Sequence, residues 1–325
     1  MRKVKIPSSV LALHKDAFAD YIEDELNNLV AQYAHEKEYC EYLRCLMIDS
    51  NESFKKKSIV IRNVRELARV ASAVDAVKAR YPRKGWSRLE KSLTKVFNYT
   101  YRFVKGYNSE SWDTGKYITM MIEAGLIYCP YCNFHQLEAY QASGGKMHKG
   151  PLDHFYDKAR YPYLALSIYN LVPVCDQCNH EKLTKPTSLG SHTHPFHDDF
   201  HDLVVFSFPD PFKAIYVKPC PIMLCPRPRK KRSFAAENLA GDVKLVYRYN
   251  AGDGRRIAQS VLEKGKKYRA WSAKKLLRLA KAKDMSMEEF YTDEFGVKPD
   301  GIDINQRQYG KLRNDLVPNI LKSRC

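Results

Sequence analysis

Four cysteines constrain this chain more than any other feature, because they form two pairs at metal-binding spacing: Cys129-Pro-Tyr-Cys132 and Cys175-Asp-Gln-Cys178. Two Cys-x-x-Cys pairs can chelate one ion through four thiolates, the usual donor set of a structural zinc site. Such a site is closed and leaves no coordination position for a catalytic water. The sequence therefore predicts that zinc joins two distant segments and that any chemistry lies elsewhere. The remaining cysteines lack this pairing and are expected to be core or surface thiols: Cys40, Cys45, Cys220, Cys225 and Cys325.

The 42 residues between the two pairs are more than a simple zinc ribbon needs. They include the dipeptides Asp153-His154 and Asn170-Leu171, and the second pair is followed by Asn179, His180, Glu181 and Lys182. Fifteen residues separate His154 from Asn170, and eight separate Asn170 from Asn179. An isolated Asp-His pair is commonly a solvated loop, and an isolated asparagine before leucine is commonly a turn. Their occurrence together, in this order, favours a functional site.

With these elements in place, the segment from about 126 to 186 resembles the HNH endonucleases, the ββα-metal nucleases. The resemblance covers less than a fifth of the chain and includes both cysteine pairs and the closing Cys-Asn-x-x-Lys. The longer segment "LDHFYDKARYPYLALSIYNLVPVCDQCNHEK" is similar to HNH nucleases of bacterial anti-phage systems, including Septu-type pairs with an ATPase partner. The resemblance implies hydrolysis of DNA phosphodiester bonds.

The resemblance also implies a role for each residue. Asp153 and Asn179 would hold a catalytic Mg²⁺ or Mn²⁺ through oxygen ligands, which such hard cations prefer. His154 points away from Asp153 on an extended segment, so it would face the attacking water as general base, with a usual pKa near ~6.5. A backbone or amide partner should fix its other ring nitrogen. Asn170 would tie the connecting loop by hydrogen bonds. Lys182 would contact a phosphate, although a solvated helix lysine fits equally well.

Three details depart from the family pattern or compete with it. Asn179 rather than histidine stands at the last motif position, as in many members of the family, and His180 beside it is the alternative functional residue. Asp157 stands where related sequences often have proline after "DHFY". The stretch "HTHPFHDDFHD" (192–202) suggests a second metal site, but packing against the nuclease core is favoured.

The formal charge of +17 is unevenly distributed along the chain. Net charge is −3 over residues 1–50, +9 over 51–128, −1 over 129–200 and +12 over 201–325. Such an excess favours a polyanionic partner, because each phosphate contact by lysine or arginine releases condensed counterions. The cations expected to contact DNA lie in residues 255–283 and in the loop with Arg227, Arg229, Lys230, Lys231 and Arg232. Charge does not separate DNA from RNA.

Apolar periodicity predicts an α+β fold in three regions. Residues 1–125 form a helical domain, with helices at 16–48, 58–79, 86–104 and 113–125. The resemblance implies that residues 126–203 form the zinc-pinned ββα-metal core. Residues 204–325 form a mixed, basic C-terminal region, with strands at 202–208, 213–218 and 243–250, an exposed loop at 219–233, a turn at 251–254, and helices at 255–283 and 307–322.

The predicted function is a metal-dependent DNA endonuclease in the cytoplasm, with structural zinc and catalytic Mg²⁺ or Mn²⁺. No apolar run is long enough to span a membrane. RNA as substrate and an ATPase or another defence-complex subunit as partner stay open. The alternative is a catalytically silent, zinc-stabilised module that binds nucleic acid or docks a partner through the acidic N-terminal segment.

Overall fold

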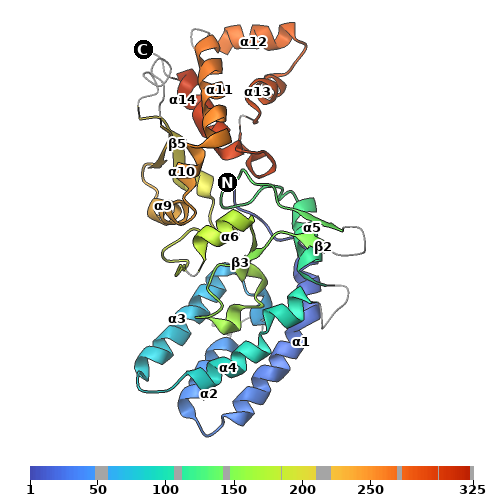
Figure 1. Ribbon diagram of the computed structural model, residues 1–325, viewed down its shortest axis with the longest axis vertical. Coiled ribbons are helices and arrows are strands. Elements are labelled where there is room, and N and C mark those ends of the chain that lie inside the picture. Colours follow the sequence, from blue (N-terminus) through green and yellow to red (C-terminus); the bar gives the residue numbers. More distant parts are fainter. Residues whose placement is uncertain are drawn as a thin grey trace.

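The computed structural model of the protein describes residues 1–47, 58–105, 112–141, 147–183, 185–209, 221–268, 273–298 and 300–322. Within these residues the fold is α+β, mostly helical with small two-stranded antiparallel sheets. Helices occupy both ends of an elongated molecule, and β3 and α6 lie in its middle (Figure 1). None of the described helices is long and apolar enough to cross a membrane.

The N-terminal part is helical, as its periodicity predicts. It comprises α1 (Ser8–Gln32), α2 (Lys37–Met47), the 3₁₀ turn η1 (Ile59–Ile61), α3 (Val64–Arg80), α4 (Ser87–Val96), the π-helical turn η2 (Thr100–Val104) and α5 (Thr114–Glu123). Local chemistry sets the start of α3: the Asn63 side chain accepts from the Glu66 N–H while the Glu66 carboxylate accepts from the Asn63 N–H. Gly125, just beyond α5, has a φ of +96°, a conformation that glycine adopts without strain.

The predicted helix at 16–48 is wrong in its continuity, because the chain turns back after Gln32. The turn lets α2 pack on both α1 and α3. Tyr33 is buried in this turn, and its ring meets that of Tyr39 edge-on at 5.1 Å. Apolar spacing continues through the turn, so periodicity alone does not reveal it. Similarly, the predicted helix at 86–104 is divided into α4 and η2.

Two short hairpins and one helix form the middle of the molecule. β1 (Ala139–Gln141) pairs with β2 (Met147–Lys149), and β3 (Leu152–His154) pairs with β4 (Leu171–Pro173). The β3–β4 connection contains the 3₁₀ turns η3 (Pro162–Leu164) and η4 (Ile168–Asn170). Helix α6 (Asp176–Lys182) follows β4 almost directly, with Cys175 as its N-cap. The order is thus strand, strand, helix.

The C-terminal part adds a small sheet and further helices. It comprises α7 (Phe200–Leu203), β5 (Val204–Ser207), β6 (Met223–Pro226), α9 (Ser233–Asp242), α10 (Leu245–Tyr249), α11 (Gly252–Tyr268), α12 (Ala273–Ala282), α13 (Met287–Phe295), η5 (Ile304–Gln306) and α14 (Gly310–Lys322). β5 and α14 confirm the strand predicted at 202–208 and the helix predicted at 307–322.

Other C-terminal predictions are corrected. Residues 243–250 form helix α10 rather than a strand, because Leu245 and Tyr249 lie one helical turn apart and are both fully buried. The predicted loop at 219–233 contains β6, which pairs with β5. The predicted turn at 251–254 opens α11. The basic helix predicted at 255–283 is described as α11 and α12, and the strand predicted at 213–218 lies outside the described residues.

The buried side chains of all three predicted regions join one contiguous apolar core. The C-terminal part is also hydrogen-bonded to the first cysteine pair through Asn133. Its side chain donates to the Ile304 carbonyl at 2.8 Å and accepts from the Lys311 N–H at 2.8 Å. The boundaries at 125 and 203 therefore stay predictions and do not separate two hydrophobic cores.

Candidate functional site

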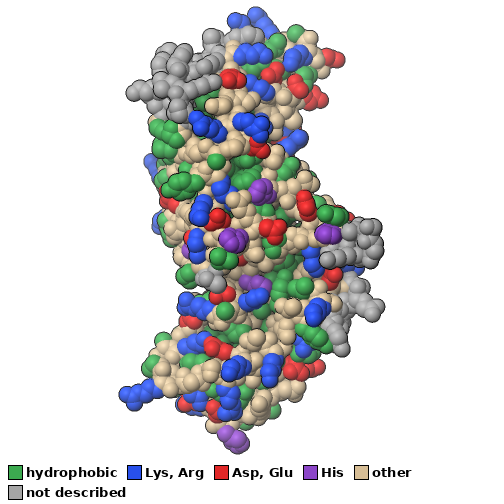
Figure 2. All heavy atoms as spheres, in the orientation of Figure 1, with side chains coloured by type: hydrophobic (Ala, Val, Ile, Leu, Met, Phe, Trp, Pro, Cys, Tyr) green, Lys and Arg blue, Asp and Glu red, His purple; other side chains and the backbone are tan. Residues whose placement is uncertain are grey.

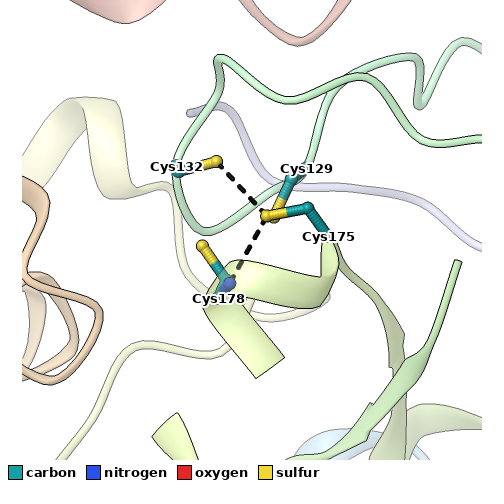
Figure 3. Close-up of side chains that lie close together, drawn as sticks. All are labelled: Cys129, Cys132, Cys175 and Cys178. Atoms are coloured by element: carbon teal, nitrogen blue, oxygen red, sulfur yellow. Dashed lines mark hydrogen bonds between the residues drawn. The ribbon is translucent and has the colours of Figure 1, made fainter. Parts of the chain in front are cut away.

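The four paired cysteines converge in the structure, as their spacing predicts (Figure 3). Their sulfur atoms all lie within 4.8 Å of one another, and among the described residues they form the one cluster that could hold a metal ion. Cys129 and Cys132 come from the loop after α5, whereas Cys175 and Cys178 come from the start of α6. The donor set fits a tetrahedral structural zinc, and it ties the loop to the helix.

Two side chains that the sequence analysis did not single out contact the sulfur atoms. His135 Nδ1 lies 3.3 Å from Cys175 Sγ, and an Arg248 guanidinium nitrogen donates to Cys178 Sγ at 3.2 Å. Four thiolates around a divalent ion carry a net negative charge, which a guanidinium offsets. Because Arg248 belongs to α10, the cluster also anchors the C-terminal helices. The Tyr249 hydroxyl adds a bond of 2.6 Å to the Cys132 carbonyl.

Asp153 is buried next to this cluster. Its Oδ2 accepts a hydrogen bond of 2.7 Å from the Tyr131 hydroxyl, and its Oδ1 accepts one of 3.0 Å from Lys182 Nζ. Tyr131 lies between the two cysteines of the first pair, so the cluster and the carboxylate share one loop. Lys182 closes α6, where it lies on the same helix face as Cys178. The carboxylate is therefore oriented from both sides by residues that the cysteines hold in place.

His154 has a fixed orientation with one ring nitrogen engaged. Its Nε2 lies 3.1 Å from the Ala165 carbonyl, so Nε2 carries the proton and donates it. This is the backbone partner that the sequence predicts, and it leaves Nδ1 as the acceptor. The Tyr99 ring packs edge-on against the imidazole at 4.7 Å.

Burial, with a contribution from nearby Lys158, lowers the pKa of His154 to about 3, below the expected ~6.5. The imidazole is thus neutral at physiological pH and is a weak base without a ligand. An anionic phosphate bound beside it would raise this pKa, because opposite charge favours the protonated form.

Asn170 ties the connecting loop together, in the way the resemblance implies. It is fully buried. Its Nδ2 donates to the carbonyls of Tyr156 and Leu164 at 3.1 and 3.0 Å, and its Oδ1 accepts from the Tyr156 N–H at 2.7 Å. Since Ala165 follows Leu164, these bonds also fix the carbonyl that orients His154.

Asn179 is half-buried on α6, three residues before Lys182 and therefore on the same side of the helix. Helical spacing thus places Asn179 on the side of α6 from which Lys182 reaches Asp153. His180 is exposed and follows Asn179 by one residue, which rotates it away from this face. The geometry favours Asn179 over His180 as the companion of Asp153.

Three cations predicted to contact nucleic acid are engaged within the protein. The side chain of Lys182 is 1% exposed and pairs with Asp153, so it offers no free ammonium to a phosphate. Arg227 donates to the His201 carbonyl and pairs with buried Asp315. Arg232 pairs with Asp198. Only Lys182 is buried: the side chains of Arg227 and Arg232 are 34% and 33% exposed, and their contacts with nucleic acid stay predictions.

Arg229, Lys230 and Lys231 are exposed, as predicted for the basic loop. Exposed cations also occur on α11 and α12, among them Arg255, Lys275, Arg278 and Lys281. Figure 2 shows lysine and arginine side chains along the whole visible face, interspersed with acidic ones. On that face the positive charge is thus spread rather than gathered into one stripe.

Lys158 is an exposed cation near His154 that the sequence analysis missed. Its Nζ lies 5.5 Å from the centroid of the Tyr99 ring, the ring that also packs on His154. Its charge contributes to the lowered pKa of His154. Lys158 is therefore better placed than Lys182 to meet a phosphate at the imidazole.

Two histidines of the segment 192–202 pack within the protein. The His194 ring lies against Phe155 at 4.2 Å between centroids, and His192 pairs with Asp242. Packing, the favoured interpretation, is what the structure shows for these two histidines.

Comparisons with known proteins add no family to this geometry: no family model, no curated protein and no solved structure matches the chain.

Proposed function

We propose that the protein is a metal-dependent endonuclease that hydrolyses phosphodiester bonds of DNA at the β3–β4–α6 unit. The observation that carries this proposal is the orientation of His154. Its Nε2 is committed to the Ala165 carbonyl, which leaves a neutral Nδ1 free to accept a proton, one residue from a buried carboxylate. His14 in the core of α1 also has Nε2 at a backbone carbonyl, but its Nδ1 accepts from Trp112, whereas the Nδ1 of His154 is left as an acceptor.

The oxygen donors fit a hard divalent cation. Asp153 and Asn179 supply a carboxylate and an amide oxygen, the ligand types that Mg²⁺ and Mn²⁺ prefer. Asp153 accepts two hydrogen bonds, and a carboxylate has about four lone-pair positions, so ligating capacity remains. When bound, the ion would supply charge neutralisation at the scissile phosphate.

The chain's own residues would carry the other parts of the reaction. His154 Nδ1 accepts the proton of the attacking water, while the Ala165 carbonyl stabilises the imidazolium that forms. Asn170 holds the Leu164–Ala165 backbone and thereby the ring orientation. Lys158 contacts the phosphate. The four-cysteine zinc keeps α6, with Asn179, against the strand with Asp153.

A catalytically silent module is the second candidate, and one observation favours it. Asp153 is already paired with a buried lysine, an arrangement that satisfies the carboxylate without a metal ion. In that case the protein would bind nucleic acid or a partner through its exposed cations and keep the ββα unit as a scaffold. Anti-phage defence and an ATPase partner are proposals that derive from the resemblance alone.

The test is incubation of purified, zinc-loaded protein with supercoiled plasmid DNA, and in parallel with RNA, across Mg²⁺ and Mn²⁺ concentrations. Wild-type protein should nick DNA only with the divalent ion, and Asp153→Ala should abolish the ion-dependent part. Co-expressed partner candidates are added if the isolated chain is inactive. Intact substrate under every condition would favour the silent module, and cleavage of RNA alone would correct the substrate.

A further inference from the structure

Asp153 is held from two sides by buried groups. The side chains of Lys182 and Asp153 are 1% and 5% exposed, and their charged atoms lie 3.0 Å apart. The same Lys182 ammonium donates to the His154 carbonyl at 3.2 Å. Tyr131 holds the other carboxylate oxygen at 2.7 Å. A positive charge therefore already lies at the residue assigned to the divalent ion.

The position of this lysine follows from the helix. Cys178 and Lys182 are four residues apart and both buried, so they project from one face of α6. The cysteine cluster brings that face to the loop of Cys129 and Cys132, which also contains Tyr131. The ammonium thus reaches Asp153 from a buried helix face and not from a flexible surface side chain.

Stability alone does not account for this pair. Removing two charges from water costs several kcal/mol per ion, and well-packed apolar residues of similar volume are commonly as stabilising. The pair stands at the one carboxylate that the proposed reaction needs for its ion. The chain holds a second buried pair, Lys311 and Asp315, so burial alone assigns no role, and the location of the Lys182 pair at the proposed ion ligand is what points to one.

We propose that Lys182 is a built-in competitor of the divalent ion for Asp153. This inference rests on the proposed function, which makes Asp153 an ion ligand. Without the ion, the ammonium pairs with the buried carboxylate and keeps it oriented. When Mg²⁺ or Mn²⁺ binds, Lys182 shares or yields its oxygen, while the Tyr131 hydroxyl keeps the other oxygen in place. Lys182 is thus a positioning residue that sets the concentration of divalent ion that the site requires.

The direction of the effect follows from Coulomb's law. Two like charges repel each other more strongly the closer they lie and the less water surrounds them, and the ion carries twice the charge of the ammonium. Removing the ammonium should therefore tighten binding of the ion, even after some loss of carboxylate orientation. An ordinary structural lysine would show the opposite, because its loss would loosen the site and weaken binding.

The experiment measures equilibrium binding of Mn²⁺ to zinc-loaded full-length protein by calorimetry and by paramagnetic resonance, without nucleic acid. Lys182→Gln keeps a donor for Asp153 and removes the charge, and Lys182→Met removes both. Tyr131→Phe is the matched control, since it removes one hydrogen bond to the same carboxylate but no charge. Zinc content and circular dichroism report whether each variant is folded, and Lys182→Gln carries the test if Lys182→Met is not.

Lys182→Gln should bind Mn²⁺ at least about tenfold more tightly than wild type. Tyr131→Phe should change the affinity by less than about threefold. Equal or weaker binding by Lys182→Gln overturns the competition. The variant Asp153→Asn separates failure of the proposed function from failure of the competition. If it binds Mn²⁺ as wild type does, the metal role of Asp153 in the proposed function fails. If Asp153→Asn loses binding while Lys182→Gln gains none, the competition alone fails.

Discussion

At the residue scale, the candidate site is a set of buried polar groups that are each given a partner. Asn170 satisfies three backbone groups of one loop, and the Ala165 carbonyl in that loop satisfies His154. His14 of α1 adds a further bond, because its Nε2 lies 2.7 Å from the neighbouring Leu166 carbonyl. The helical part therefore supports the loop that orients the proposed base.

His14 makes a pH-dependent contribution to stability whose sign can be stated. Its Nδ1 accepts from the Trp112 Nε1–H at 3.2 Å, so both ring nitrogens are engaged in the neutral form. Burial lowers its pKa from 6.5 to about 4. The unfolded chain therefore binds a proton below pH 6.5 that the folded chain refuses, and stability is lost as the pH falls from about 6.5 to about 4.

His14→Gln should flatten this dependence. In wild-type protein, His14 should lower the free energy of unfolding, measured by urea titration, by up to about 1.4 kcal/mol for each unit that the pH falls in this interval, since one pKa unit corresponds to that energy. The variant should lack this decrease. His35→Gln, at an exposed position in the turn after α1, is the control and should keep the wild-type slope. Parallel slopes for wild type and His14→Gln would contradict the assignment.

At the element scale, sequence reasoning succeeded where spacing itself encodes a contact. The spacing of the two cysteine pairs predicted their cluster, whereas the loop tie of Asn170 was implied by the resemblance. Predictions from the sequence were wrong where the same residue types fit two different structures. Leu245 and Tyr249 fit a strand or a helix, and Lys182 fits a solvated or a buried position. Tertiary packing determines both structures: residues 243–250 become a helix that contacts the cysteine cluster through Arg248, and Lys182 is buried by its pair with Asp153. Local spacing in a single sequence does not show these contacts.

The cysteine cluster should control the whole β3–β4–α6 unit, together with α10. Cys175→Ser should lose the bound metal and soluble folded protein with it, because the metal ties α6 to the loop of Cys129 and Cys132 while serine still caps the helix. Cys225→Ser is the matched control: this half-buried thiol lies on β6 outside the cluster and should leave metal content unchanged. Elemental analysis and thermal unfolding measure both. One zinc per chain in folded Cys175→Ser protein would refute the four-cysteine site.

At the scale of the whole molecule, the charge of +17 is distributed over an elongated body whose ends are helical. Part of the basic C-terminal charge is engaged internally, as Arg227 and Arg232 show. The cations that remain exposed on the same loop, Arg229, Lys230 and Lys231, are the candidates for backbone contacts with a nucleic acid.

Neutralising that exposed trio should alter the salt dependence of DNA binding. The triple change of Arg229, Lys230 and Lys231 to alanine should reduce the slope of log affinity against log salt by roughly 0.9 for each phosphate that the protein no longer neutralises, so by about 2 to 3. Changing Lys91 and Lys95, exposed on α4 at the far helical end, should leave the slope unchanged. A slope equal to wild type in the triple variant, from fluorescence anisotropy at several salt concentrations, would show that this loop faces something other than DNA.

The most direct test of the central claim is the single-turnover rate of DNA cleavage by His154→Ala beside His180→Ala, with saturating Mn²⁺ and under the condition that activates wild-type protein. The two histidines lie at opposite ends of the same motif, but only His154 has its Nε2 fixed by a backbone carbonyl and its Nδ1 left as an acceptor. Loss of a general base typically costs ~10²–10⁴-fold in rate. His154→Ala should show a loss of that size with Mn²⁺ binding retained, and His180→Ala should cleave at close to the wild-type rate. Wild-type cleavage by His154→Ala would contradict the account.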